Sequence, residues 1–136
     1  MSELIRVKVT TLTNDIGWGI GIELVNEGHT VPYYAGSYYF PRSVRGSATK
    51  SIHQTIERAC EYLPPDREIV VEGTHPIFQH QKHKLLSRIR NVLGKETNVL
   101  VFHYKKLYGQ GRALAEDALQ HRSTIDERLS TTEGEF

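Results

Sequence analysis

The start of the chain decides its fold, and residues 5–22 read IRVKVTTLTNDIGWGIGI. The apolar side chains at positions 5, 7 and 9 alternate with polar ones, which predicts a strand with one buried face. Asn14 and Asp15 then predict a tight turn. Glycine at alternate positions after the turn predicts a second strand that another backbone or helix approaches closely. We therefore expect an antiparallel hairpin over residues 4–25.

The rest of the chain predicts a third strand followed by alternating helices and strands. The expected elements are a strand at 30–39, a helix ended by Pro64 and Pro65, a strand at 68–72, a helix at 76–93, a strand at 98–103 and a last helix ending near 122. This order predicts one α/β domain with a mixed five-stranded sheet flanked by helices. Residues 1–122 would form that domain, and the polar residues 123–136 would form a flexible tail.

Length and composition fit a single globular domain. The chain has 136 residues, of which 38% are hydrophobic and 24% charged, and its formal net charge is +1. A charged partner would therefore have to be recognised by a local concentration of charge. The single cysteine cannot form an internal disulfide, and no apolar run approaches the roughly 20 residues that span a bilayer. We expect a cytoplasmic protein without membrane contact.

Three features, taken in this order along the chain, resemble the ribonuclease H-like superfamily over roughly residues 4–122. They are the hairpin at 9–20 with its Gly-aromatic-Gly second strand, the strand end at 69–74, and the last helix at 111–119 with its alanine-acid-leucine pattern. The resemblance implies a ribonuclease H-like fold. It also implies a nuclease chemistry in which carboxylates from the first strand, first helix, fourth strand and last helix hold two divalent cations.

The carboxylates that this resemblance requires are incomplete. Thr10 or Thr11 stands where the family keeps its first-strand acid, and hard divalent cations need charged oxygen ligands. The first hypothesis is therefore a catalytically inactive domain, a pseudo-nuclease without a cofactor, that binds nucleic-acid backbone or scaffolds a nucleic-acid complex. The alternative is a divergent metal-dependent phosphodiester hydrolase that uses Mg or Mn with Asp15, Glu72 and Asp117. Each of these acids also has a structural interpretation, as a turn former, a helix cap and a surface ion pair respectively.

A basic helix is the predicted contact with phosphate. Residues 80–90 contain several cations and no acid, and Lys84 and Arg88 share one helical face. The predicted nucleic-acid-binding residues lie on this helix and in the loops before the first and last helices: Lys82, Lys84, Arg88, Arg90, Arg42, Arg45, Lys105 and Lys106. A solvated helix face without a ligand explains the same pattern nearly as well. Contacts to backbone alone would not distinguish DNA, RNA and hybrid.

A third hypothesis is a protein-interaction or assembly module. In this interpretation the sheet edge and the tyrosine-rich third strand bind a protein partner or a second copy of the chain. It predicts a stable homo-oligomer with no affinity for nucleic acid.

Overall fold

The computed structural model describes residues 4–42, 47–64, 67–94, 99–103 and 110–128. In chain order its elements are β1 (Leu4–Thr13), β2 (Gly17–Asn26), β3 (Tyr34–Pro41), α1 (Ser47–Ala59), a short 3-10 helix (Cys60–Tyr62), β4 (Glu68–Gly73), α2 (Ile77–His80), α3 (Lys82–Leu93), β5 (Val99–His103), α4 (Gly111–His121) and β6 (Ile125–Arg128). None of the helices in these ranges has both the length and the apolar character needed to cross a membrane.

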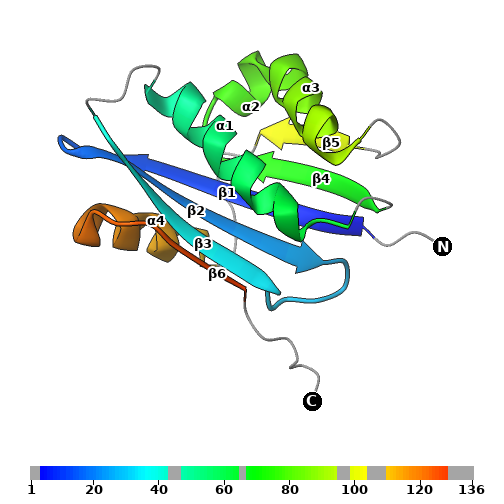
Figure 1. Cartoon of the computed structure of the whole chain (residues 1–136), viewed down its shortest axis with the longest axis horizontal. Helices are drawn as coiled ribbons and strands as arrows, with labels where there is room; N and C mark the ends of the chain where they lie inside the picture. Colours follow the sequence, from blue (N-terminus) through cyan, green and yellow to red (C-terminus); the bar gives the residue numbers. More distant parts are fainter. Residues whose placement is uncertain (1–3, 43–46, 65–66, 95–98, 104–109, 129–136) are drawn as a thin grey trace.

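The strands form one mixed sheet in the order β5-β4-β1-β2-β3-β6 (Figure 1). β1 is antiparallel to β2, with Ile5 opposite Asn26 and Thr13 opposite Trp18. β2 is antiparallel to β3, whereas β1 is parallel to β4 and β4 is parallel to β5. The five strands expected from the sequence are present, and the α/β class with a mixed sheet is confirmed.

A sixth strand extends the sheet beyond this expectation. β6 pairs antiparallel with β3, with Ser37 opposite Ile125 and Tyr34 opposite Arg128. The sequence predicts a flexible tail for 123–136, so for residues 125–128 that prediction is wrong. These residues form a strand because the outer edge of β3 offers unpaired backbone groups. Residues 129–136 lie outside the described ranges.

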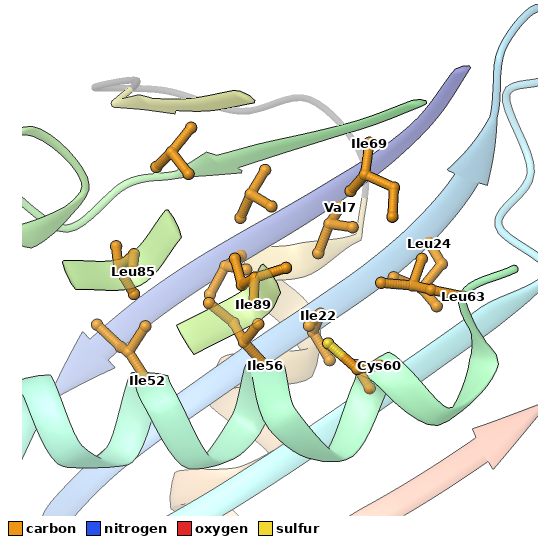
Figure 2. Packing of buried hydrophobic residues seen from close by; sticks show 14 of the residues in the cluster. Val7, Ile22, Leu24, Ile52, Ile56, Cys60, Leu63, Ile69, Leu85 and Ile89 are labelled. Carbon is orange, nitrogen blue, oxygen red and sulfur yellow. The ribbon is translucent and has the colours of Figure 1, made fainter. Parts of the chain in front are cut away.

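Helices cover both faces of the sheet. α1, α2 and α3 lie on one face and α4 on the other (Figure 1). The larger core lies beneath α1 and α3, where Val7 and Ile22 of the sheet pack with Ile52, Ile56 and Ile89 of the helices (Figure 2). Burying each of these side chains contributes roughly 1.5–3 kcal/mol. Because side chains alternate along a strand, the sequence neighbours of the core residues point to the α4 side.

α4 approaches β2 closely because two glycines remove side chains from that face. A Cβ atom added to Gly19 would overlap the carbonyl oxygen of Ala115, and one added to Gly21 would overlap the carbonyl oxygen of Gly111. The close approach predicted from the alternating glycines is confirmed. It places the beginning of α4 directly on β1 and β2.

Two element boundaries differ from the sequence prediction. The third strand begins at Tyr34 rather than at residue 30, since Pro32 has no N–H to donate to a ladder. The helix expected over 76–93 is divided into α2 and α3, because Gln81 has φ −120° and ψ 32°, outside the helical region.

Two tyrosines of the tyrosine-rich third strand point into the core. Tyr34 and Tyr38 are fully buried, their hydroxyl oxygens are 2.5 Å apart, and the Tyr34 ring stacks on that of Tyr62. The outer edge of β3 over residues 34–37 is paired with β6. These tyrosines therefore do not form the exposed edge on which the assembly hypothesis relies.

Candidate functional site

A cavity of about 640 Å³ lies between α1 and α3. α1 contributes polar residues at helical spacing, and α3 contributes part of the face opposite its apolar stripe. Beneath the cavity, Ile52 of α1 and Leu85 of α3 belong to the core that holds both helices on the sheet (Figure 2). The cavity, called the α1–α3 groove below, is lined by Thr49, Lys50, His53, Gln54, Glu57, Lys84, Ser87 and Arg88.

Positive charge exceeds negative charge in the α1–α3 groove. Three permanent cations, Lys50, Lys84 and Arg88, line it with one carboxylate, Glu57. Arg88 Nε is 3.4 Å from Glu57 Oε2, and both side chains are partly exposed. Such a pair contributes at most about 1 kcal/mol. Within the described residues neither lysine has an ion-pair partner, so the groove carries uncompensated positive charge.

His53 is the most deeply buried ionisable group of the groove. It is 7% exposed, and its Nδ1 is 3.5 Å from Nη1 of Arg88. Its Nε2 is buried and has no hydrogen-bond partner in the described part of the chain. Burial lowers the pKa of His53, Arg88 and Lys84 lower it further, and Glu57 opposes them. Its surroundings therefore favour the neutral form of His53.

Hydroxyl side chains occupy the carboxyl ends of β1 and β4. The backbone N–H of Thr11 donates to Oγ1 of Thr74 at 3.1 Å, which places the two residues side by side. Thr11 alternates with the core residues of β1 and points to the α1 face, whereas Thr10 points to α4. The hydroxyl oxygens of Thr11 and of Ser51 in α1 are buried, and neither has a hydrogen-bond partner among the described residues.

No protein-family model and no curated protein sequence matches the chain. Solved structures do match. RNase H1 from Halobacterium salinarum NRC-1 has a TM-score of 0.63 at 14% identity, with 87% of this chain and 98% of that chain covered. LC11-RNase H1 in complex with an RNA/DNA hybrid has a TM-score of 0.65 at 14% identity, with the same shares covered. The N-terminal RNase H domain of rv2228c from Mycobacterium tuberculosis, a fusion with maltose-binding protein, has a TM-score of 0.64 at 12% identity, covering 88% of this chain and 96% of that chain.

The chain has a ribonuclease H-like fold. The fold expected from the opening hairpin is thereby confirmed. In this ribonuclease H-like arrangement the carboxyl ends of β1 and β4 and the beginning of α1 lie at the same end of the molecule (Figure 1).

The ribonuclease H-like fold does not bring the three acids of the nuclease hypothesis together. Asp15 is exposed in the β1–β2 turn, where the Asn14 side chain accepts hydrogen bonds from two backbone N–H groups. Asp117 is exposed on α4 and lines a second cavity of about 320 Å³ beside β3 and β6. Among the described residues, no group of three acid, histidine or cysteine side chains is placed to hold a metal ion. Asp15, Glu72 and Asp117 do not make up such a group in the described structure.

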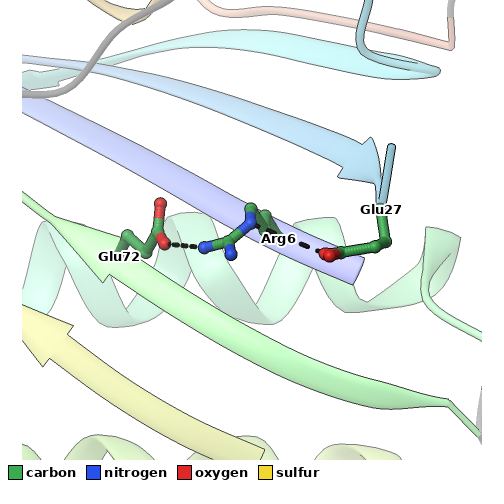
Figure 3. A network of polar contacts seen from close by, with 3 residues as sticks. All are labelled: Arg6, Glu27 and Glu72. Atoms are coloured by element: carbon green, nitrogen blue, oxygen red, sulfur yellow. Dashed lines mark hydrogen bonds and ion pairs between the residues drawn. The ribbon is translucent and has the colours of Figure 1, made fainter. Parts of the chain in front are cut away.

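Glu72 is engaged in an ion pair on the face opposite α1. Nη1 of Arg6 donates to Oε2 of Glu72, and Nε of Arg6 is 3.8 Å from Oε1 of Glu27 (Figure 3). Glu72 alternates with the core residue Val71, and it is opposite Lys8 in the β1–β4 register, so it points to the α4 side of the sheet. The carboxylate therefore stabilises the sheet rather than facing Thr11 and Thr74.

The predicted nucleic-acid-binding residues do not all lie together in the structure. Lys84 and Arg88 line the α1–α3 groove, whereas Lys82 and Arg90 are exposed on α3 outside its lining. Arg42 lies at the end of β3, away from the groove lining. Outside the described residues lie Arg45, Lys105 and Lys106.

Arg42 links β3 to the turn between β1 and β2. Its Nε donates to the carbonyl oxygen of Asn14 at 2.9 Å, and its Nη2 donates to Oγ1 of Thr13 at 3.1 Å. Its guanidinium carbon is 5.7 Å from the centre of the Trp18 ring. These contacts give Arg42 a structural role at the hairpin.

The sequence interpretation missed most of the residues that α1 contributes to the groove. Thr49, His53 and Glu57 recur at intervals of four, with Lys50 and Gln54 beside them. This spacing predicts one polar helical face and was available in the sequence. The packing of α3 beside that face could not be predicted from the sequence.

Proposed function

We propose that this ribonuclease H-like domain binds nucleic acid through its phosphate backbone and does not cleave it. The observation that carries the proposal is the α1–α3 groove, where Lys50, Lys84 and Arg88 outnumber Glu57. Phosphate contacts of this kind supply essentially all sequence-independent affinity for nucleic acid. A nucleic-acid ligand is further supported by LC11-RNase H1, which has the same fold and was solved with an RNA/DNA hybrid.

The groove sets the strength and the salt dependence of the proposed binding. Its three cations can neutralise at most about three phosphates, which gives a slope of log affinity against log salt of about −2 for single strands and about −3 for duplexes. Affinity without base contacts is typically about 10⁻⁴–10⁻⁶ M near physiological salt. Binding should therefore be weak, sensitive to salt and indifferent to sequence.

The absence of cleavage is proposed from the chemistry at the carboxyl ends of β1 and β4. Thr11 and Thr74 contribute neutral hydroxyl groups there. A pair of divalent cations needs negatively charged oxygen ligands to offset its charge, so these residues do not fit a two-metal centre. Glu72, the acid nearest to the carboxyl end of β4, is paired with Arg6.

The test measures binding and cleavage together on labelled single-stranded, duplex and hybrid oligonucleotides, with magnesium, manganese or EDTA, over a salt series. Lys84→Glu should weaken binding and reduce the salt slope by about one unit. Arg112→Glu is the matched control, since it makes the same charge change at an exposed residue of α4 that pairs with Glu116 at 3.1 Å. Arg112→Glu should leave the affinity within about twofold of the parent chain.

Equal affinities and salt slopes for Lys84→Glu and Arg112→Glu would show that the α1–α3 groove is not the binding site. Metal-dependent cutting that EDTA abolishes would overturn the inactive assignment. If Glu72→Gln then also abolished the cutting, the nuclease alternative would be restored with Glu72 as one of its residues.

A further inference from the structure

His53 is a buried ionisable group of the α1–α3 groove, and its Nε2 atom has no hydrogen-bond partner among the described residues. A buried polar atom is normally paired with protein or water, and one that is unpaired calls for a ligand, an ordered water or a functional role. We propose that His53 is the proton-linked group of this phosphate site, which takes up a proton when the backbone of a nucleic acid enters the groove. This inference rests on the proposed function and names the residue that would make it pH-dependent.

The hydrogen positions follow from the contact with Arg88. A guanidinium group only donates hydrogen bonds, so the His53 Nδ1 atom, 3.5 Å from Arg88 Nη1, accepts, and neutral His53 carries its proton on Nε2. Nε2 is the atom that lacks a partner among the described residues. A second proton, added at Nδ1, would point at a permanent cation. The charged form of His53 is therefore disfavoured unless an anion compensates for Arg88.

The charged groups around His53 come from both helices. α3 supplies Lys84 and Arg88, and α1 supplies Lys50 and Glu57. In the free chain burial lowers the pKa of His53 below its usual value of 6.5, Arg88 and Lys84 lower it further, and Glu57 opposes them. A bound phosphodiester adds a negative charge among the same side chains and raises that pKa, because an opposite charge favours the protonated form.

The direction of the pH effect follows from this difference. Above the pKa of the bound state His53 is neutral with or without ligand, and affinity does not depend on pH. Between the bound-state and the free-state pKa, binding takes up a proton, and affinity rises as pH falls by at most about tenfold per pH unit. Below the free-state pKa the affinity reaches a plateau.

The experiment titrates the affinity of labelled oligothymidylate between about pH 8 and about pH 5, where histidine ionises, at constant ionic strength. Neither the phosphodiester nor the thymine base titrates in this range, so a pH effect comes from the protein. The parent chain should bind more tightly at acid pH, and His53→Gln should flatten the curve. His83→Gln is the matched control, because His83 is exposed on α3 outside the groove lining.

Calorimetry in two buffers of different ionisation enthalpy should show proton uptake on binding by the parent chain and by His83→Gln, but not by His53→Gln. If His53→Gln does not fold, the imidazole carbon shifts of His53 in the parent chain supply the same information. They should titrate at higher pH with oligothymidylate present than without it.

The pH curves separate the two proposals. A curve of equal steepness in the parent chain and in His53→Gln, or a His53 shift that the ligand does not move, overturns the role of His53. Salt-sensitive binding that depends on Lys84 but not on pH overturns only this inference. Absence of binding at every pH overturns the proposed function as well.

Discussion

Removing either member of the Arg6–Glu72 ion pair should destabilise the fold, but by unequal amounts. The side chain of Glu72 is 5% exposed, whereas that of Arg6 is 39% exposed and also lies 3.8 Å from Glu27. Arg6→Met leaves a buried carboxylate without its cation. Glu72→Gln leaves a guanidinium that still reaches water and Glu27. The arginine substitution should therefore be the more costly one.

The magnitudes follow from the burial of each partner. Removing one member of a fully buried pair costs about 3–5 kcal/mol, and the partial exposure of Arg6 reduces the cost of Arg6→Met to about 2–3 kcal/mol. In Glu72→Gln the amide oxygen still accepts a hydrogen bond, so the loss should be about 1 kcal/mol. Combining Arg6→Met with Glu72→Gln removes the stranded charge and should recover about half of the loss seen in Arg6→Met.

Urea unfolding followed by circular dichroism gives the unfolding free energy of each variant by linear extrapolation. Arg112→Met is a control, because its exposed pair with Glu116 should contribute less than about 1 kcal/mol. Equal losses for Glu72→Gln and Arg6→Met, or a double variant whose loss equals the sum of the single ones, would refute the assignment of Glu72 to a structural ion pair.

Three further predictions concern buried positions. Gly21→Ala should lower the unfolding free energy by about 1–3 kcal/mol, because its Cβ overlaps the backbone carbonyl of Gly111, and an unchanged urea midpoint would contradict this packing. Burial raises the pKa of Glu23 above 4.5, so the stability it contributes is present below pH 4.5 and is lost as pH rises through the raised value. Glu23→Gln should flatten the pH dependence of the unfolding free energy in this range. Curves of equal slope for the parent chain and Glu23→Gln would contradict the raised pKa of Glu23. Burial raises the pKa of Cys60 to about 12, so a thiol reagent should label the native chain much more slowly than the chain in urea.

The first five strands and the close approach of another element to β2 were predictable because they depend on local patterns. The alternation over residues 5–9 identifies β1, and Gly19 and Gly21 indicate where a helix comes close. The same kind of pattern identified Lys84 and Arg88, since residues four apart share a helical face. Each of these inferences uses side chains within one element.

The features that the sequence did not predict depend on contacts between distant elements. β6 is held by backbone pairing with β3. Residues 125–128 read IDER and show no apolar alternation, so the sequence gives no local signal for a strand there. The α1–α3 groove joins Lys50 and His53 to Lys84 and Arg88, more than 30 positions later in the chain. Lys82 and Arg90 carry a positive charge, as Lys84 does. The packing of α3 places them outside the groove lining.

Binding and cleavage would depend on different side chains of this ribonuclease H-like fold. The proposed binding uses permanent cations on the facing sides of α1 and α3, whereas two-metal cleavage needs carboxylates that hold the two cations. The hydroxyl groups of Thr11 and Thr74 do not repel one another as clustered carboxylates do. The carboxyl ends of β1 and β4 therefore need no cation to be stable. The proposed phosphate binding in the groove therefore requires neither a metal ion nor the acids that would hold one.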